Sequence, residues 1–241
     1  MSEIATVASW LRAARSVAVI TGAGISAESG VPTFRGPDGL WRSFRAEDLA
    51  TPEAFERNPE LVWEWYRWRR AKIATAQPNA GHHVLARLEA RVPEFLLLTQ
   101  NVDGLHTRAG SRRLVELHGN IWRARCTKEG TRFDQSGQWS VASGQCPSCG
   151  APLRPDVVWF GEALDPVVIN RAIAAVERCD VLLLVGTSGV VYPVAGFPLV
   201  ARRRGAHVVE INVEATPLSD IAHAVLRGTA GTVLPAVEAA L

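Results

Sequence analysis

Four short apolar runs along the chain have the length of buried β-strands. They cover residues 16–20, 95–99, 181–185 and 207–211, and each is followed by glycine or polar residues. Strands that are apolar on both faces are typical of a parallel sheet that is covered on both sides. Ligands of such sheets bind at the carboxyl ends of the strands, so we expect the four polar strand ends to meet in one cleft.

The segments between these runs have apolar residues at helical spacing. Four helices are therefore expected, over residues 3–15, 80–90, 166–179 and 194–204. Strands that alternate with helices predict an α/β fold, in which a mostly parallel sheet has helices on both faces.

Two stretches interrupt this alternation. Residues 37–78 are rich in aromatic side chains and helical in pattern, and residues 119–158 contain three of the four cysteines. We expect these two insertions to form a small inserted domain, helical with a cysteine knuckle. The main domain then comprises residues 1–36, 79–118 and 159–241.

The first strand run leads into the glycine-rich segment TGAGISAE, residues 21–28. Its Gly-x-Gly-x-x-Ala pattern allows the backbone to approach a phosphate closely, and the N-terminus of the helix that follows has unpaired N–H groups that bind anions. A strand ending in Asp or Glu about 20 residues later, which marks dinucleotide-dependent dehydrogenases, does not follow. The pattern therefore predicts a Rossmann-like nucleotide-binding sheet, but not that of a dehydrogenase.

Charge and composition exclude several other classes of protein. The 241 residues carry a net charge of +2, so direct binding to nucleic acid or to a membrane surface is not expected. No apolar run approaches the ~20 residues of a membrane helix, and no signal peptide is visible. With only four cysteines a disulfide scaffold is not expected, and we expect a reducing, cytoplasmic location.

Six segments, in the same order along the chain, resemble the signature segments of the sirtuin family. They are GAGISAESGVPTFRG (22–36), TQNVDGLH (99–106), LHGN (117–120), VVWFGE (157–162), GTS (186–188) and INVE (211–214). Together they span nearly the whole chain. The resemblance implies an NAD-dependent protein-lysine deacylase, which consumes NAD⁺ as a co-substrate and yields nicotinamide, 2′-O-acyl-ADP-ribose and free lysine.

The resemblance also implies roles for residues of the expected cleft. His118 is the implied catalytic residue: the substrate amide oxygen attacks C1′ of the nicotinamide ribose, nicotinamide leaves, and His118 then acts as base toward a ribose hydroxyl. An imidazole with a pKa near ~6.5 suits this role near neutral pH. The residues implied in NAD⁺ binding are Gly22, Ala23, Gly24, Ile25, Ser26, Phe34, Arg35, Gln100, Asn101, Asp103, Gly186, Thr187, Ser188, Asn212 and Ala230.

Within this set, Asn101 and Asp103 have the most specific chemistry. Asn both donates and accepts hydrogen bonds, as the carboxamide of nicotinamide requires, and Asp can hold a polar or positive partner. By resemblance, both line the nicotinamide pocket together with Ser26 and Ile25. The histidines interpreted as structural are His82, His83, His106, His207 and His223.

The implied second substrate is an acyl-lysine protein or peptide. Tyr66 and Arg69, three positions apart on one helix face, resemble the pair of sirtuins that act on negatively charged acyl groups, and Ala50 resembles the small residue of their acyl pocket. Because Arg can bind a carboxylate through two charge-assisted hydrogen bonds, desuccinylase and demalonylase activities are expected beside deacetylase activity. By resemblance, the peptide is bound by Val158, Phe160 and Gly161.

The cysteines depart from the family pattern of two Cys-x-x-Cys pairs. Cys146 and Cys149 form one pair, whereas Cys126 is followed at the third position by Glu129. Three thiolates and one carboxylate can complete the tetrahedron of a structural Zn²⁺ ion. The alternative is an eroded knuckle that holds no metal, and the sequence leaves both interpretations open.

Two other functions would use the same features. An ADP-ribosyltransferase or NAD⁺ glycohydrolase needs the same nicotinamide pocket, and a non-catalytic NAD⁺-binding sensor needs binding alone. The segment 157–162 and the acyl pocket favour a lysine substrate. The presence of His118, Asn101 and Asp103 counts against a sensor.

Overall fold

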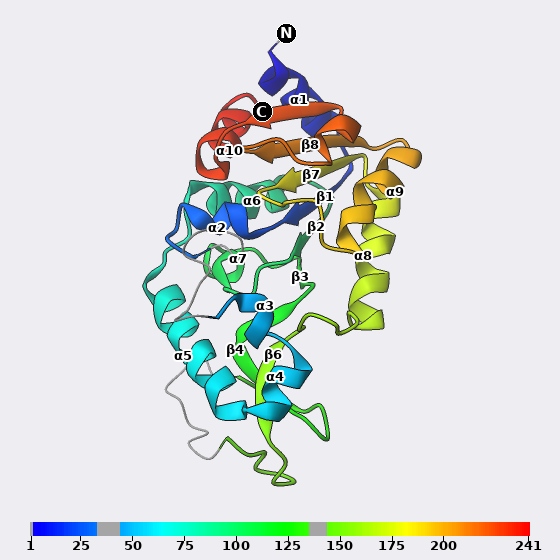
Figure 1. Ribbon diagram of the computed structural model, residues 1–241. Coiled ribbons are helices and arrows are strands. Elements are labelled where there is room, and N and C mark those ends of the chain that lie inside the picture. Colours follow the sequence, from blue (N-terminus) through cyan, green and yellow to red (C-terminus); the bar gives the residue numbers. More distant parts are fainter. Residues whose placement is uncertain (1, 33–43, 135–143) are drawn as a thin grey trace.

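The computed structural model describes residues 2–32, 44–134 and 144–241 of the chain. At its centre is a six-stranded sheet in which all neighbouring strands run parallel (Figure 1). In spatial order the strands are β3 (Leu114–Glu116), β2 (Glu94–Thr99), β1 (Ser16–Thr21), β7 (Val181–Val185), β8 (His207–Asn212) and β9 (Ala224–Arg227). The expected α/β fold with a mostly parallel sheet is confirmed.

The four predicted strands correspond to β1, β2, β7 and β8, with ends that differ by at most one residue. The edge strands β3 and β9 were not predicted, because they are only three and four residues long and bury alternate residues. A pattern this short cannot be distinguished from a loop.

The strand order contains one switch point. From β1 the chain builds outward through β2 and β3, and it then returns to the other side of β1 to build β7, β8 and β9. Thr21, the last residue of β1, pairs with Thr99 of β2 on one side and with Val185 of β7 on the other. The polar strand ends therefore meet at the switch point, where open α/β sheets bind their ligands.

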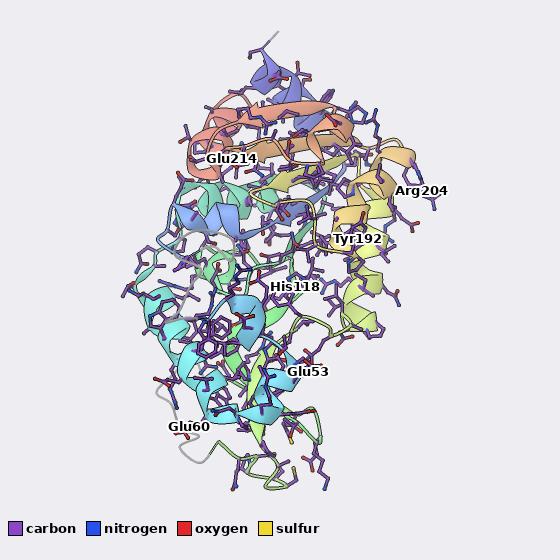
Figure 2. The ribbon with its side chains drawn as sticks, in the orientation of Figure 1. Glu53, Glu60, His118, Tyr192, Arg204 and Glu214 are labelled. Atoms are coloured by element: carbon purple, nitrogen blue, oxygen red, sulfur yellow. The ribbon has the colours of Figure 1, made fainter. Side chains whose placement is uncertain are left out.

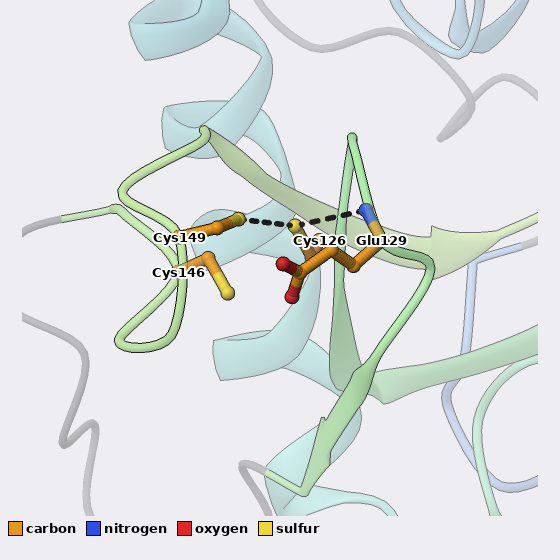
Figure 3. Close-up of side chains that lie close together, drawn as sticks. All are labelled: Cys126, Glu129, Cys146 and Cys149. Atoms are coloured by element: carbon orange, nitrogen blue, oxygen red, sulfur yellow. Dashed lines mark hydrogen bonds between the residues drawn. The ribbon is translucent and has the colours of Figure 1, made fainter.

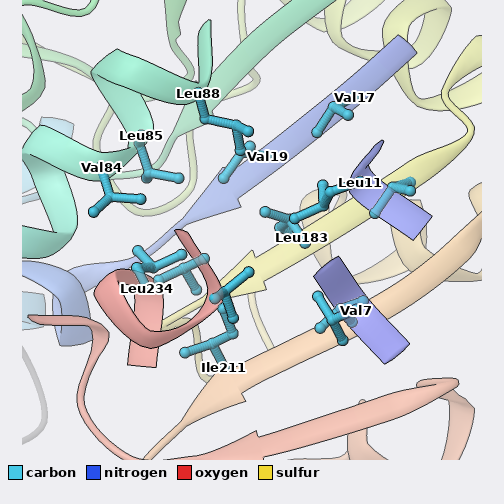
Figure 4. Packing of buried hydrophobic residues seen from close by; sticks show 14 of the residues in the cluster. Val7, Leu11, Val17, Val19, Val84, Leu85, Leu88, Leu183, Ile211 and Leu234 are labelled. Atoms are coloured by element: carbon cyan, nitrogen blue, oxygen red, sulfur yellow. The ribbon is translucent and has the colours of Figure 1, made fainter. Parts of the chain in front are cut away.

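Helices cover both faces of the sheet, as predicted. One layer consists of α1 (Glu3–Ala13), α6 (Ala80–Arg91) and α10 (Ala230–Ala239), and the other of α8 (Pro166–Arg178) and α9 (Phe197–Arg203). Strand β1 contributes to both layers because its side chains alternate. Val17 and Val19 pack in the cluster of α1 and α6 shown in Figure 4, whereas Ala18 and Ile20 pack with α8 and α9.

Most predicted helix ends lie within two residues of the observed ones. The exception is the segment 194–204, which divides into a 3₁₀ turn, η2 (Val194–Gly196), and α9. Pro198 lies in the first turn of α9, where its missing N–H is tolerated, whereas inside a continuous helix it would remove a hydrogen bond. A further 3₁₀ turn, η3 (Ser219–Ile221), precedes β9.

The predicted insertions contribute a second layered region, at the lower end of the molecule in Figure 1. Its described residues form three helices, α3 (Ala46–Leu49), α4 (Pro52–Arg57) and α5 (Pro59–Thr75), and an antiparallel sheet in the order β5 (Arg132–Asp134), β4 (Gly119–Cys126) and β6 (Leu153–Val157). The sheet was not predicted. Its apolar core includes Val102 and Leu105, which follow β2, so the two regions share buried contacts. The exact domain boundaries stay a prediction.

Helix α5 buries one face against this small sheet. Asn58 caps its N-terminus by accepting a hydrogen bond from the Leu61 amide, and Pro59 occupies the first turn. Its buried residues are Val62, Trp65, Tyr66, Arg69, Arg70 and Ile73. No helix in the described part of the chain is long and apolar enough to cross a membrane.

Candidate active site

The glycine-rich turn after β1 packs directly against the loop after β7. Gly22 is the N-cap residue of helix α2 (Ala23–Ala27), and its N–H donates to the Val185 carbonyl at 3.0 Å. The Gly24 N–H donates to the Gly186 carbonyl at 2.8 Å. A Cβ atom on Gly24 would lie 2.7 Å from the Cα of Gly186. The glycines thus permit the close approach of two backbones, and the amides of Gly22 and Gly24 donate hydrogen bonds within the protein.

The other predicted NAD⁺-binding residues of the strand ends are linked by hydrogen bonds. The Gln100 amide donates to the Thr187 hydroxyl at 2.9 Å, and the Asn212 amide donates to the Thr187 carbonyl at 2.9 Å. Ser188 is exposed beside them. Ala230 is buried at the first position of α10, against Gly81. The structure thus brings the ends of β1, β2, β7 and β8 to one place, as expected from the sequence.

Asn101, Ser26 and Asp103 form a polar network beside the glycine turn, in which Ser26 and Asp103 are buried. The Asn101 amide donates to the Gly22 carbonyl at 3.0 Å and to the Ser26 hydroxyl at 3.1 Å. Ser26 in turn donates to an Asp103 oxygen at 2.7 Å, and the Leu105 amide donates to the other oxygen at 2.8 Å. Burial raises the pKa of the Asp103 carboxyl, while these two hydrogen bonds and the charge of Arg69 lower it in part.

Two histidines that were interpreted as structural extend this network. His82 Nε2 lies 3.4 Å from the Ser26 hydroxyl, and His106 Nε2 lies 3.0 Å from the Thr21 hydroxyl. Burial lowers the pKa of His82 to about 4 and that of His106 to about 3, so both rings are neutral near pH 7. The contact of His82 with Ser26 joins residues 56 positions apart, so no local sequence signal indicates it.

His118 lies between the parallel sheet and the α3–α5 region, near the centre of the molecule in Figure 2. It follows β3 and immediately precedes Gly119, where φ is +80° and a Cβ would lie 2.1 Å from the Asp156 carbonyl oxygen. Only glycine allows β4 to approach β6 so closely here. This turn directs the His118 ring toward the end of β2.

The protonation state of His118 follows from its hydrogen bond. Nδ1 lies 3.0 Å from the Gln100 carbonyl oxygen. Because a carbonyl only accepts hydrogen bonds, Nδ1 carries the proton and Nε2 has a lone pair available. Burial lowers the pKa of His118 below 6.5, and the bond to Gln100 opposes this shift in part. The ring is therefore a neutral acceptor at neutral pH.

The segment after β6 is tied to both His118 and Ala50. The Val158 amide donates to the His118 carbonyl at 2.9 Å, and the Phe160 amide donates to the Ala50 carbonyl at 2.9 Å. The strand itself ends at Val157, and Gly161, with φ +86°, lies in the turn that follows. Phe160 remains 45% exposed. Three predicted substrate-binding residues, Ala50, Val158 and Phe160, are thus held beside the predicted catalytic residue.

Tyr66 and Arg69 lie on the buried face of α5, as their spacing predicted. The Tyr66 oxygen accepts a hydrogen bond from Nε1 of Trp159 at 2.9 Å, and burial raises its pKa to about 12. The Arg69 guanidinium lies 5.3 Å from the Trp65 ring centroid. Burial lowers the pKa of Arg69, and the charges of Tyr66 and Asp103 oppose this shift. Arg69 is thus electrostatically coupled to the network of Asp103.

The cysteine cluster lies at the far end of the small antiparallel sheet. Figure 3 shows the side chains of Cys126, Glu129, Cys146 and Cys149 close together. One ligand atom from each lies within 4.8 Å of the others. The Sγ atoms of Cys126 and Cys149 are 3.5 Å apart, and the Glu129 amide donates to Cys126 Sγ. Three sulfurs and a carboxylate at such separations fit a Zn²⁺ ion with bonds of about 2.0–2.3 Å.

Two predicted NAD⁺-binding residues, Phe34 and Arg35, lie outside the described residues. Trp122 was not predicted for this site, yet its indole N–H donates to the Asp103 carbonyl at 2.8 Å. Trp122 belongs to β4, which begins at Gly119 directly after His118. The position of its side chain therefore depends on the direction of this strand. Sequence spacing alone carries no signal for such a contact.

Comparison with known proteins identifies the family to which the chain belongs. The Sir2 family model matches residues 22–193 of the chain. A curated relative, the NAD-dependent protein deacylase of Aquifex aeolicus, is 53% identical over 223 residues, which are 92% of this chain and 93% of the relative.

Two solved structures are similar over the whole chain. A Sir2 homologue in complex with NAD is 47% identical with a TM-score of 0.92, covering 100% of this chain and 94% of the other. A mutant Sir2 homologue in complex with 2′-O-acetyl ADP ribose is 46% identical with a TM-score of 0.93, covering 100% and 96%. The family model spans well over half of the sequence and the curated relative is identical at more than half of the aligned positions. This chain therefore belongs to the Sir2 family.

Proposed function

We propose that the protein is an NAD-dependent protein-lysine deacylase that transfers the acyl group of a lysine side chain to ADP-ribose, releasing nicotinamide and free lysine. The observation that carries the proposal is the tautomer of His118. Its Nδ1 bonds to the carbonyl of Gln100, the residue before Asn101, and its backbone carbonyl bonds to Val158 of the segment 158–160. A proton acceptor between a carboxamide-binding network and a peptide-binding segment suits acyl transfer between these two substrates.

Each part of the cleft has a chemistry that suits one part of NAD⁺. The side-chain oxygen of Asn101 and the carboxylate of Asp103 offer acceptors for the NH₂ group of the nicotinamide carboxamide. Gly186 to Ser188 and Asn212, at the ends of β7 and β8, lie where an adenosine and its phosphates would be held. The Sir2 homologue of comparable fold binds NAD, which supports the same placement here.

His118 supplies the base for the second half of the reaction. Once nicotinamide has left, a ribose hydroxyl must lose its proton as it attacks the acyl carbon. Nε2 of His118 accepts that proton, and the Gln100 carbonyl stabilises the imidazolium that forms, because it accepts a hydrogen bond from Nδ1. The depressed pKa keeps the ring unprotonated before this step.

The substrate acyl group is proposed to include succinyl and malonyl besides acetyl. Arg69 is 5% exposed, so its charge is partly desolvated, and a carboxylate at this point gains a strong interaction with it. The neutral Tyr66 hydroxyl on the same helix face can donate to the same group. Ala50 belongs to the same buried cluster as Tyr66, and its small side chain adds little bulk there.

One assay tests the proposed reaction class. We expect nicotinamide release from NAD⁺ to depend on an acyl-lysine peptide, with one equivalent of deacylated lysine formed per nicotinamide. Nicotinamide release at the same rate without peptide would instead identify a glycohydrolase. Transfer of ADP-ribose to a protein acceptor would identify an ADP-ribosyltransferase. NAD⁺ binding with no release at all would identify a sensor.

We further propose that Cys126, Cys146, Cys149 and Glu129 bind a structural Zn²⁺ ion. The cluster lies beyond the small sheet, away from His118, so the metal would stabilise the fold and take no part in acyl transfer. Because such a site does not exist in the unfolded chain, its binding free energy adds to the stability of the fold.

Removal of the metal is therefore expected to destabilise the protein. A chelator should lower Tm by roughly 2–4 °C for each kcal/mol of binding free energy lost at this chain length. Native mass spectrometry should show one zinc per chain, absent from Cys146→Ser and less tightly retained by Glu129→Gln. Replacing the remote Cys179 with serine is the control for zinc content. A chain without zinc, and with the same Tm in chelator, would identify a metal-free knuckle.

A further inference from the structure

The hydroxyl of Tyr66 is a buried group whose orientation is set by one neighbour. Trp159 Nε1 donates to its oxygen at 2.9 Å, and an indole nitrogen can only donate. The phenol oxygen is therefore the acceptor in this contact. Its own hydrogen donates to no other described residue, although Tyr66 is only 2% exposed. A buried donor without an acceptor is costly, which marks this hydrogen as available to a ligand.

Trp159 itself is held on several sides. The Arg154 guanidinium lies 3.3 Å from its ring centroid, and the Phe55 ring packs at 5.3 Å. Glu162 accepts hydrogen bonds from the backbone amide of Trp159 at 2.8 Å and from Arg154 at 2.9 Å. The flanking amides of Val158 and Phe160 are bonded to His118 and Ala50. Trp159 therefore has little freedom to turn its N–H away from Tyr66.

This arrangement matters for an acidic acyl group. A phenol that points a lone pair at a carboxylate repels it, whereas a phenol that points its hydrogen at the carboxylate binds it. Because the hydroxyl rotates about its C–O bond, both states are open to an isolated tyrosine. The indole N–H of Trp159 occupies one lone pair of the Tyr66 oxygen. The hydroxyl hydrogen of Tyr66 therefore points away from Trp159. The raised pKa of Tyr66 keeps that hydrogen in place at neutral pH.

We propose that Trp159 is a positioning residue for acyl specificity: its indole N–H occupies the Tyr66 oxygen, so that the Tyr66 hydroxyl donates to the terminal carboxylate of a succinyl or malonyl group. This inference rests on the proposed deacylase function and on its acidic acyl substrates. It also links the peptide-binding segment to the acyl pocket, since Trp159 lies between the bonded residues Val158 and Phe160.

The variant Trp159→Phe tests the inference, because phenylalanine keeps an aromatic ring beside Arg154 and Phe55 but has no N–H. We expect kcat/KM for a succinyl-lysine peptide to fall about five- to thirtyfold, the range that loss of one or two such hydrogen bonds produces. The loss should arise in KM, since His118 is not altered. For the matching acetyl-lysine peptide, which has no carboxylate, any fall in kcat/KM should be smaller, so the ratio of succinyl to acetyl efficiency should decrease.

A matched control is Trp63→Phe. Trp63 is a partly buried residue of α5 whose indole donates to the Leu153 carbonyl at 2.9 Å, so the same atoms are removed without touching Tyr66. The ratio of succinyl to acetyl efficiency should stay at the wild-type value in this variant. A fall in that ratio would mean that loss of any indole bond near α5 disturbs the pocket, which would overturn the inference.

A double-mutant cycle shows whether Trp159 acts through Tyr66. If it does, Trp159→Phe combined with Tyr66→Phe should cost no more desuccinylation than Tyr66→Phe alone. Because Tyr192 is the other tyrosine of the chain, ¹³Cζ-tyrosine labelling gives two resonances, and Trp159→Phe should shift that of Tyr66 but not that of Tyr192. Additive losses, or an unmoved Tyr66 resonance, would show that Trp159 acts on the fold alone.

Different experimental results would contradict the role of Trp159 and the proposed deacylase function. Equal losses on both peptides, or wild-type desuccinylation by Trp159→Phe, would overturn the role of Trp159 alone. A wild-type chain that deacetylates but does not desuccinylate would overturn the acidic acyl preference, and the role of Trp159 with it. A wild-type chain that acts on neither peptide would overturn the deacylase itself.

Discussion

Replacing His118 with alanine is expected to lower kcat for deacylation about 10²–10⁴-fold, the usual contribution of a general base. The ring is held by a single hydrogen bond, from Nδ1 to the Gln100 carbonyl, and only half-buried, so its removal should leave the fold intact. NAD⁺ binding should persist, since the Asn101–Ser26–Asp103 network does not contact His118 directly. Steady-state kinetics with an acyl peptide, together with calorimetric NAD⁺ binding, measures both quantities.

The pH profile gives a second measure of the same role. Burial lowers the pKa of His118 below 6.5, so the neutral ring predominates at pH 7 and protonation occurs only at more acidic pH. We therefore expect kcat/KM to be level on the alkaline side of neutrality and to fall at acidic pH, in a limb that lies below the pKa of a free histidine. The alanine variant should lose this acid limb. Near-wild-type turnover by His118→Ala would rule out the assignment, as would a profile that declines with rising pH through neutrality.

Arg69→Met is expected to lower desuccinylation efficiency about ten- to a hundredfold. A hydrogen bond to a charged partner contributes about 1.5–3 kcal/mol, and each 1.36 kcal/mol corresponds to a factor of ten. Methionine keeps the length and the apolar stem of the side chain beside Trp65 but removes the charge. Deacetylation should change much less, because an acetyl group has no carboxylate. Kinetics on paired succinyl- and acetyl-lysine peptides provides the comparison.

Arg67→Met is the matched control for this variant. Arg67 lies on the same helix, two residues earlier, but its side chain is exposed. Its replacement should leave both activities unchanged. If Arg69→Met reduced succinyl and acetyl turnover equally, then Arg69 would support the fold or the Asp103 network instead of binding the acyl carboxylate.

The strands that the sequence predicts well are those of the parallel sheet. Runs such as 181–185 are buried on both faces, so every residue must be apolar and the pattern is continuous. The small antiparallel sheet gives no such pattern, because its buried positions include charges that neutralise one another. Asp156 of β6 is 3% exposed and is paired with Arg123 at 3.0 Å and Arg132 at 3.1 Å. The sequence therefore has charged residues at positions where a buried strand is expected to have apolar ones.

The residues of the candidate site were named from contiguous motifs, which carry their own chemistry. The hydrogen bonds between these residues could not be predicted from the motifs, because they join segments that are distant in the sequence. The tautomer of His118 depends on the carbonyl of Gln100, 18 positions earlier, and the polarity of the Tyr66 hydroxyl depends on Trp159, 93 positions later. The contact of His82 with Ser26 and the hydrogen bond from Trp122 to Asp103 also join residues that are distant in the sequence.

The sequence by itself determined the α/β class, four of the six parallel strands, the glycine turn and the identity of the candidate catalytic histidine. Each of these depends on the polarity of neighbouring residues or on the order of residues in one short segment. Only the tertiary structure decided which donor meets which acceptor: the Ser26–Asp103 bond, the free Nε2 of His118 and the Trp159–Tyr66 contact. Hydrogen bonds between distant segments depend on the distances and angles that the packed fold imposes, and no local pattern of residues encodes these.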